Sequence, residues 1–299
     1  MPRLIGALKK AGITAPDLHK PRSEPVPRMG GIGIFVGFAA AMTFSALLGL
    51  DYRLLFAIFL SATLALLAGL IDDLFDFGKV ALVITTFLIS MPVVAFQAGS
   101  TLVYLTPIGP ADFGWAFWLL VPFAFAFTMN GVNIYAGFNG LEAGLGAISA
   151  LSLGTSAIIY GSLESAVALF ALGGGLLAFL KWNWFPAKIF PGGTGTFLIG
   201  AVLASSIIAG TIKIAGIIAL LPYFANFVLR ARDRFEWSVG TTVSWGKITS
   251  RKRNALWALF MYRRRKSERY VVVRCVAVQL AFAAAAIVFA YLHVNFIRR

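Results

Sequence analysis

"LLFAIFLSATLALLAGLI", residues 54–71, contains no charged side chain and runs directly into two aspartates, Asp72 and Asp73. A helix of about 18 apolar residues is long enough to cross the hydrocarbon core of a bilayer. Further apolar runs recur along the chain at 31–50, 80–97, 113–129, 143–160, 165–181, 195–210, 212–229 and 271–292. The sequence therefore predicts an all-α polytopic membrane protein with about nine transmembrane helices.

Composition agrees with this class. The 299 residues are 59% hydrophobic and only 13% charged, with a mean hydropathy of +0.84, whereas a soluble domain carries about 25% charged residues. The single cysteine, Cys275, excludes a disulfide framework and Cys-based zinc sites. The two histidines, His19 and His293, lie too far apart in the sequence to suggest a metal pair. We interpret residues 1–299 as one integral membrane domain.

The distribution of the net charge of +14 predicts the topology. If every span crosses the membrane, 20 of the 26 Lys and Arg residues fall on one side, in segments 1–29, 72–79, 130–142, 182–194 and 230–270. Basic loops stay in the cytoplasm, so we expect a cytoplasmic N-terminus and an external C-terminus. The segment 1–29 is then a basic cytoplasmic tail and 230–270 a basic cytoplasmic loop. Attraction to anionic lipid explains the charge better than binding to nucleic acid.

Acidic residues near membrane depth are costly and are functional candidates by default. On the cytoplasmic side they are Asp72, Asp73, Asp76, Glu142, Asp233 and Glu236. On the outer side we interpret Asp51, Asp112 and Glu164 as residues that hydrate helix ends. The adjacent pair Asp72–Asp73 differs, because two ionised neighbours repel each other. Such a pair typically binds a cation, pairs with bases or handles a proton.

Four polar stretches share the cytoplasmic face: 17–35, 69–79, 130–144 and 183–197. Alone, their asparagines are consistent with helix caps and their glycines with close helix packing. Together they supply oxygen ligands for a hard cation such as Mg²⁺, glycine amides for phosphate, and an aromatic ring, Phe190, that can stack on a base. Basic side chains that could neutralise a pyrophosphate are Lys79, Lys188, Arg251 and Arg253. These stretches predict a lipid-facing Mg–nucleotide site.

Three of these motifs carry a resemblance to a known family. "LIDDLFD" (70–76), "NIYAGFNGLEAG" (133–144) and "PAKIFPGGTGTFLIGA" (186–201) resemble motifs of the polyprenyl-phosphate N-acetylhexosamine-1-phosphate transferases. The second motif is similar to the UDP-GlcNAc–dolichyl-phosphate branch. The resemblance implies transfer of a sugar-1-phosphate from a UDP-sugar, in first place UDP-GlcNAc, to a polyprenyl or dolichyl phosphate at the cytoplasmic face of the plasma membrane. It further implies Mg²⁺ or Mn²⁺, release of UMP, and homodimers.

The resemblance also implies roles for individual residues. Asp72 matches the base that deprotonates the lipid phosphate, and Asp73 the residue that positions phosphate or cation. Asn133 matches a metal ligand, with Asn130 in the same polar cluster. The remaining substrate-binding candidates are Asn139 and Phe190 for uridine, Lys79 for the pyrophosphate, Arg251 and Arg253 for the sugar, and Glu142, Gly192 and Thr194 beside them.

The sequence departs from the family pattern in three ways. No span precedes the segment 1–29, so we count nine spans where the family has ten. No His-rich motif occurs within 230–269, which argues against a muramoyl-pentapeptide substrate. Gly193 stands where the family has a metal-binding aspartate. Loss of that carboxylate is expected to weaken the binding of the cation severely, unless Asp73, Asp76 or Glu142 replaces it as a ligand.

Several hypotheses follow. The first is a working transferase in which another acid replaces the missing ligand. The second, which Gly193 favours, is an impaired transferase on an intact fold. The third is a non-catalytic protein that binds UDP-sugar or lipid phosphate, or acts in assembly. A transporter is disfavoured, because the polar residues gather at one face and transporter sites lie near the midplane.

Overall fold

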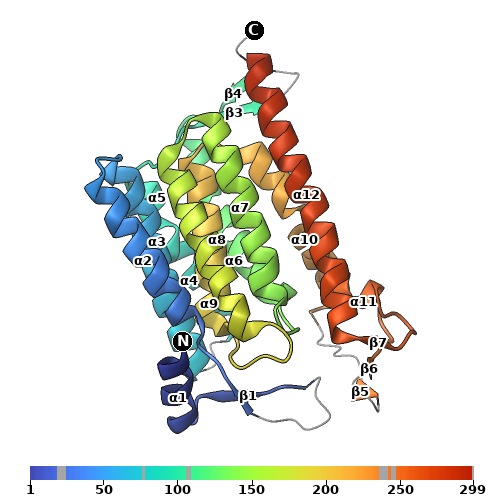
Figure 1. Ribbon diagram of the computed structural model, residues 1–299. Coiled ribbons are helices and arrows are strands. Elements are labelled where there is room, and N and C mark those ends of the chain that lie inside the picture. The colour runs from blue at the N-terminus through green and yellow to red at the C-terminus, as the bar shows by residue number, and fades with distance from the viewer. Residues whose placement is uncertain (19–24, 76–77, 106–108, 236–241, 244–246, 298–299) are drawn as a thin grey trace.

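The computed structural model describes residues 1–18, 25–75, 78–105, 109–235, 242–243 and 247–297. Long helices dominate it and run roughly alongside one another as a bundle (Figure 1). The helices of the bundle are α2 (Gly31–Leu47), α3 (Tyr52–Phe75), α4 (Lys79–Ile89), α5 (Met91–Ala95), α6 (Ala116–Tyr135), α7 (Leu141–Tyr160), α8 (Leu163–Asn183), α9 (Gly192–Ala209), α10 (Lys213–Arg232) and α12 (Glu268–Ile297).

The all-α membrane architecture is confirmed. Within the described part of the chain, seven helices are long and apolar enough to span a membrane: α3, α6, α7, α8, α9, α10 and α12. Two other predicted spans form shorter apolar helices. The first, α2, has 17 residues. The second, expected at 80–97, is divided into α4 and α5 at Ser90, where Pro92 lacks the N–H that would continue the α4 ladder.

Helix α9 forms the core of the bundle. Every residue from Gly193 to Ala209 is buried, as expected of a helix that is apolar on all sides. It packs against α3, α6 and α8. Large side chains such as Phe44, Leu47 and Phe75 are instead exposed on other helices, where they present an apolar surface to lipid.

Small residues allow the helix backbones to approach α9 closely. A Cβ atom on Gly69 of α3 would overlap the carbonyl of Gly193, and one on Gly31 of α2 would overlap the Thr194–Gly195 peptide. Farther along, a Cβ on Gly200 would overlap the backbone of Met129 in α6. Such contacts replace the hydrophobic effect as the main force between helices in lipid. They also fix the N-terminal end of α9 against α2 and α3.

The connecting segments gather at the two ends of the bundle. One end carries α1 (Pro2–Lys10), the hairpin of β1 (Thr14–Pro16) and β2 (Pro25–Pro27), the small sheet of β5 (Thr242–Val243), β6 (Lys247–Ile248) and β7 (Lys266–Ser267), and α11 (Leu256–Leu259) (Figure 1). We call it the basic end. The hairpin of β3 (Leu102–Leu105) and β4 (Gly109–Asp112) and the end of α12 lie at the opposite end. Helix α1 and the end of α12 thus lie at opposite ends of the bundle.

At the opposite end the acidic residues make local structural contacts. Asp51 accepts a 2.8 Å hydrogen bond from the N–H of Arg53, and Glu164 accepts one of 3.2 Å from the N–H of Asp51. Asp112 accepts a 2.6 Å hydrogen bond from the Thr101 hydroxyl, which lowers the pKa of that carboxyl. These contacts agree with the structural role expected for the three residues.

Candidate active site

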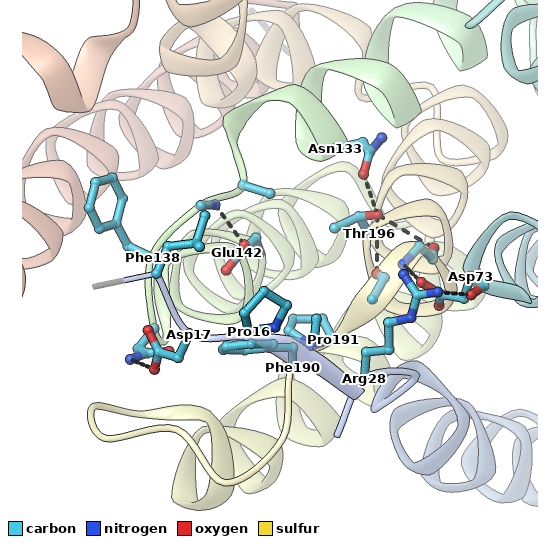
Figure 2. A pocket seen from close by; sticks show the side chains of 17 residues that line it. Pro16, Asp17, Arg28, Asp73, Asn133, Phe138, Glu142, Phe190, Pro191 and Thr196 are labelled. Atoms are coloured by element: carbon cyan, nitrogen blue, oxygen red, sulfur yellow. Dashed lines mark hydrogen bonds between the residues drawn. The ribbon is translucent and has the colours of Figure 1, made fainter. Parts of the chain in front are cut away.

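A cleft of about 430 Å³ opens at the basic end. It is lined by the end of β1 and the two residues that follow it, Arg28 ahead of α2, the end of α3, the end of α6, the 136–140 loop, the start of α7, and residues 190–193 and Thr196 at the start of α9. Figure 2 shows Arg28 and Asp73 toward one side and Asp17 and Phe138 toward the other, with Phe190 and Pro191 between them. All four of the predicted polar stretches thus meet here, together with Ala15 and Pro16.

Asp73 fixes the start of α9. Its Oδ1 accepts a 2.9 Å hydrogen bond from the N–H of Gly193, and its Oδ2 accepts one of 3.0 Å from the N–H of Thr194. These amides are among the donors that a helix leaves unpaired at its N-terminus, so a carboxylate from α3 caps α9. Gly192 makes this contact possible: its φ is +71°, and a Cβ there would lie 2.5 Å from Asp73 Oδ2.

The capping interaction corrects one expectation from the sequence. The amides of Gly193 and Thr194 donate to Asp73, and that of Gly195 donates to the carbonyl of Pro191. They are therefore not free to bind a phosphate. Thr194 is fully buried, and its hydroxyl donates to the Pro191 carbonyl at 2.9 Å. It closes the turn from within and does not line the cleft.

Asp72, the neighbour of Asp73 on α3, lies beside Gly193 but outside the cleft. It is half-buried and does not line the cleft. Its Oδ2 lies 3.0 Å from the place that a Cβ of residue 193 would occupy. Ile71 and Leu74, its neighbours on α3, are 41% and 52% exposed. Asp72 therefore lies beside a lipid-exposed apolar surface, and Gly193, which does line the cleft, lies next to it.

The end of α6 supplies an amide oxygen. Asn133 Oδ1 accepts a 3.0 Å hydrogen bond from the hydroxyl of Thr196, and both residues line the cleft. Asn130, expected on the same face, instead donates from Nδ2 to the carbonyl of Ala126 at 2.7 Å and does not line the cleft. This bond satisfies the amide within its own helix.

The 136–140 loop connects three distant segments. The N–H of Asn139 donates to Oε1 of Glu268 at 2.6 Å, and its Nδ2 donates to Oδ2 of Asp17 at 3.1 Å. All three side chains are at most 3% exposed. Gly140, whose φ is +79°, provides the tight turn ahead of α7. The loop thus holds the chain ahead of β2 and the start of α12 against α7.

Two cleft residues carry buried polar atoms without a partner. Oε1 of Glu142 accepts a 3.0 Å hydrogen bond from the N–H of Gly137, but its Oε2 has no partner among the described residues. Arg28 donates from Nη2 to the backbone carbonyl of Asp73, and its Nε likewise has no partner in the described chain. Buried polar atoms are normally hydrogen-bonded. Both residues also line the cleft, so these two atoms are candidates to contact a ligand bound there.

Two backbone hydrogen bonds fix the position of Phe190. Its N–H donates to the carbonyl of Pro27 at 2.8 Å, and its carbonyl accepts from the N–H of Gly30 at 2.9 Å. The ring lies at the cleft beside Pro16 (Figure 2). A half-buried ring fixed in this way is suited to stack on a flat ligand.

The structure brings together only part of the predicted set. The predicted residues that line the cleft are Asp73, Asn133, Asn139, Glu142, Phe190, Gly192 and Gly193. Arg251 and Arg253 do not; Arg253 lines a separate pocket beside α12. Lys188 lies over the ring of Trp182 at 5.6 Å. Lys79 is the first residue of α4, its side chain lies outside the described part, and so do Asp76 and Glu236.

Sequence reasoning missed Asp17, Arg28, Thr196 and Glu268. Asp17 and Arg28 fall within the polar stretch 17–35, which signalled the segment but not the residues. Thr196 follows the glycines of the fourth stretch. Glu268 lies just ahead of the last apolar run, and its partner is 129 residues away in sequence. A local pattern does not indicate such a contact.

Comparison with known proteins defines the class. Residues 55–211 match the model of glycosyl transferase family 4. This segment includes most of α3, most of the cleft and all of α9. The chain therefore belongs to glycosyl transferase family 4, a family of enzymes, and is a multi-pass membrane protein.

Individual relatives extend the match. A Sulfolobus acidocaldarius protein named as a UDP-N-acetylglucosamine–dolichyl-phosphate N-acetylglucosaminephosphotransferase is 33% identical over 96% of this chain and 90% of its own length. A phospho-N-acetylmuramoyl-pentapeptide-transferase of Desulforamulus reducens is 33% identical over 60% of this chain and 58% of its own. A Bacillus subtilis protein named as an undecaprenyl-phosphate N-acetylglucosaminyl 1-phosphate transferase is 27% identical over 69% and 58%. The family resemblance drawn from the motifs is confirmed.

Proposed function

We propose that the protein transfers a HexNAc-1-phosphate, in first place GlcNAc-1-phosphate, from a UDP-sugar to a polyprenyl or dolichyl phosphate and releases UMP. The reaction would take place at the basic end, facing the cytoplasm of the cell. Relatives named for this chemistry match the chain over nearly its whole length. The observation that carries the proposal is the arrangement around Gly193: a polar cleft on one side, and Asp72 beside a lipid-exposed surface on the other.

The cleft would hold the soluble donor. Phe190 stacks on uracil, and the Asn139 loop borders the same space. The unpartnered Oε2 of Glu142 can accept a hydrogen bond from a hydroxyl of the nucleotide or the sugar. Arg28 lies across from it, near Asp73, and its guanidinium can neutralise the pyrophosphate (Figure 2). This leaves Asp73 a positioning role, because both of its carboxylate oxygens already hold α9.

The acceptor would approach Asp72 from the membrane. Its isoprenoid tail remains in lipid, and the exposed apolar surface of α3 near Asp72 provides that contact. Asp72 takes the proton from the lipid phosphate. The resulting oxygen attacks the sugar-linked phosphorus, a new P–O–P bond forms, and the old pyrophosphate bond breaks as UMP leaves. A positioned base contributes a factor of about 10²–10⁴.

Metal binding is part of the proposal. No group of three His, Cys, Asp or Glu side chains that could hold a metal is found within the described residues. Oxygen donors are nevertheless present near Gly193: the Asp72 carboxylate, the Asn133 carbonyl and the Thr196 hydroxyl. Mg²⁺ is commonly bound by one or two carboxylates together with substrate phosphates. The donor set therefore fits Mg²⁺ or Mn²⁺, which would supply charge neutralisation at the pyrophosphate.

Gly193 would make this cation site weak. Of the acids considered as replacements, Asp73 is engaged by two backbone amides, which argues against it as a metal ligand. Glu142 lines the cleft with one free oxygen and remains the better candidate of the two. We propose an impaired enzyme, with turnover that needs a high concentration of divalent cation.

The test is a transfer assay with radiolabelled UDP-GlcNAc and a polyprenyl phosphate in detergent, with Mg²⁺ varied. We expect slow, Mg²⁺-dependent formation of labelled lipid and an equal amount of UMP, both abolished in Asp72→Asn. Saturable binding of UDP-GlcNAc without lipid product at any Mg²⁺ concentration would instead support the non-catalytic alternative. Unchanged turnover in Asp72→Asn would refute the role given to that carboxylate.

A further inference from the structure

A second pocket of about 470 Å³ lies at the basic end, beside the start of α12. Its lining shares no residue with that of the active-site cleft. Three cationic side chains line it: Arg253, Arg264 and Lys266. Among the described residues that form this pocket, none is acidic. We call it the α12 pocket.

Two tyrosines of the α12 pocket each have two cations close to the ring. Arg253 lies 4.3 Å and Arg263 5.3 Å from the ring centre of Tyr262. Lys266 lies 4.6 Å and Arg274 5.2 Å from the ring centre of Tyr270. Cation–π contacts stabilise a charge by about 0.5–1 kcal/mol at exposed sites. They hold the cations in place without neutralising them, so the positive potential remains available to an anion.

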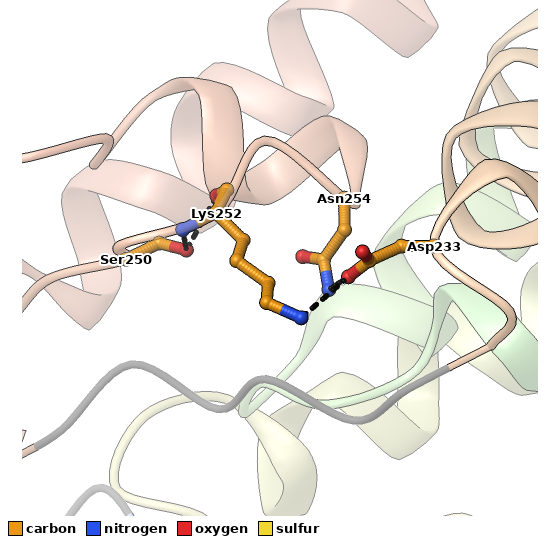
Figure 3. A network of polar contacts seen from close by, with 4 residues as sticks. All are labelled: Asp233, Ser250, Lys252 and Asn254. Carbon is orange, nitrogen blue, oxygen red and sulfur yellow. Dashed lines mark hydrogen bonds and ion pairs between the residues drawn. The ribbon is translucent and has the colours of Figure 1, made fainter.

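A polar network holds the two residues that flank Arg253 in the sequence. Asp233, directly after α10, accepts a 2.8 Å hydrogen bond from Asn254 Nδ2 and pairs with Lys252 Nζ at 3.3 Å (Figure 3). Lys252 and Asn254 are thus both held by Asp233, and Arg253 stands between them in the sequence. Arg253 is exposed, and it lines the α12 pocket.

The pocket also has an apolar part beside the start of a helix that can span a membrane. Leu259 of α11 is 42% exposed and lines the pocket together with Phe260. Tyr270 belongs to the first turn of α12, a helix long and apolar enough to span a membrane. The pocket thus combines cations, aromatic rings and apolar side chains where a membrane helix begins, which is where lipid headgroups lie.

We propose that the α12 pocket binds the phosphate headgroup of an anionic phospholipid, with Leu259 and Phe260 in contact with the upper part of an acyl chain. Free phosphate shares the headgroup chemistry, but it does not use the apolar wall. A nucleotide shares the charge, but the cleft already provides a separate place for it.

The experiment measures saturable binding of short-chain lipids to the full-length protein in a neutral detergent. The probes are dioctanoyl phosphatidylglycerol, dioctanoyl phosphatidylcholine and inorganic phosphate, and the readout is the shift in melting temperature. The test variant is Arg264→Gln/Lys266→Gln. The matched control is Arg265→Gln/Arg269→Gln, which removes the same charge from exposed residues outside the pocket.

We expect the wild type and the control variant to bind phosphatidylglycerol alike. The pocket variant should bind it about thirty-fold more weakly, from roughly fivefold for each cation near an anionic headgroup. An equal loss in both variants would show that only diffuse surface charge attracts the lipid. Equal shifts with phosphatidylcholine would remove the requirement for an anion, and equal shifts with inorganic phosphate would remove the requirement for a lipid. Competition by UDP would assign the pocket to the donor site. Each of these four results would overturn the proposal.

Discussion

Restoring a carboxylate at position 193 is the sharpest test of the site. In Gly193→Asp the new Cβ would stand 3.0 Å from Asp72 Oδ2 and 3.2 Å from the carbonyl of Gly69. These separations are slightly shorter than ordinary van der Waals contact, so the neighbouring groups must move by a few tenths of an ångström. The helical start of α9 tolerates the side chain, because Gly193 itself does not have a positive φ.

Whether Gly193→Asp destabilises or stabilises the fold depends on whether a cation is bound. Two unit charges about 4 Å apart repel by about 4 kcal/mol at an effective dielectric of about 20. Asp72 is only half-buried, so solvent and salt reduce this to about 1–2 kcal/mol. Gly193→Asp should therefore be less stable than the wild type in EDTA. Mg²⁺ between the two carboxylates reverses the interaction and stabilises the fold by mass action.

The assay compares thermal unfolding of three proteins across a Mg²⁺ titration: the wild type, Gly193→Asp and Gly193→Asn. The asparagine variant has nearly the same shape without the charge, so it isolates the steric cost. We expect Mg²⁺ to raise the melting temperature of Gly193→Asp alone. In the transfer assay the Mg²⁺ concentration for half-maximal rate should fall about tenfold, since ligand charge sets the affinity for hard cations.

Two results would refute this reasoning. If Gly193→Asp and Gly193→Asn unfold alike in EDTA and respond alike to Mg²⁺, then position 193 does not face a cation. If the wild type is already fully active at low Mg²⁺ and the aspartate adds nothing, then Gly193 does not impair the enzyme.

Three further predictions concern packing, the donor and pH. Gly69→Ala should destabilise the protein by about 1–3 kcal/mol through its clash with the Gly193 carbonyl, whereas Gly37→Ala on α2, with open space around it, should not; thermal unfolding of the two separates them. Phe190→Leu should weaken UDP binding about tenfold or more through lost stacking, measured by calorimetry, and leave the melting temperature within a few degrees; equal affinity would place uracil elsewhere. The hydrogen bond from Asn254 lowers the pKa of Asp233, so this carboxylate stabilises the fold above its unfolded pKa of about 3.9 and loses that effect as pH falls through the lower folded value. The stability difference between wild type and Asp233→Asn should thus be present at neutral pH and vanish in acid, and a constant difference would contradict it.

Local sequence pattern predicted the helices well, for a physical reason. A bilayer requires every backbone polar group to be satisfied within the segment, so each span shows as a continuous apolar run. The boundaries were less accurate. Helix α6 continues to Tyr135, six residues beyond the expected end at 129, because Asn130 bonds to its own helix and does not end it.

The sequence predicted that the polar stretches of one membrane face lie together, since polar groups there are costly unless they act together, and most of the residues that line the cleft come from these stretches. The roles of the individual residues were not predicted. The sequence pair Asp72–Asp73 does not reveal that one carboxylate caps α9 while the other lies beside Gly193 and outside the cleft. Arg28 and Glu268 were recognised as part of the candidate site only from their contacts with residues 45 and 129 positions away in the sequence. Such roles depend on tertiary packing, which periodicity and composition do not reveal.

The contact of Asn139 with Glu268 has a consequence for biosynthesis. A membrane protein is inserted from its N-terminus, so Asp17 and Asn139 are in place long before Glu268 has been synthesised. Until the last helix enters the membrane, the backbone N–H of Asn139 lacks its acceptor and the 136–140 loop lacks one of its anchors. The 136–140 loop that borders the cleft therefore gains its contact with Glu268 from one of the final segments to leave the ribosome, and a chain that stops short of α12 would reach the membrane without that anchor.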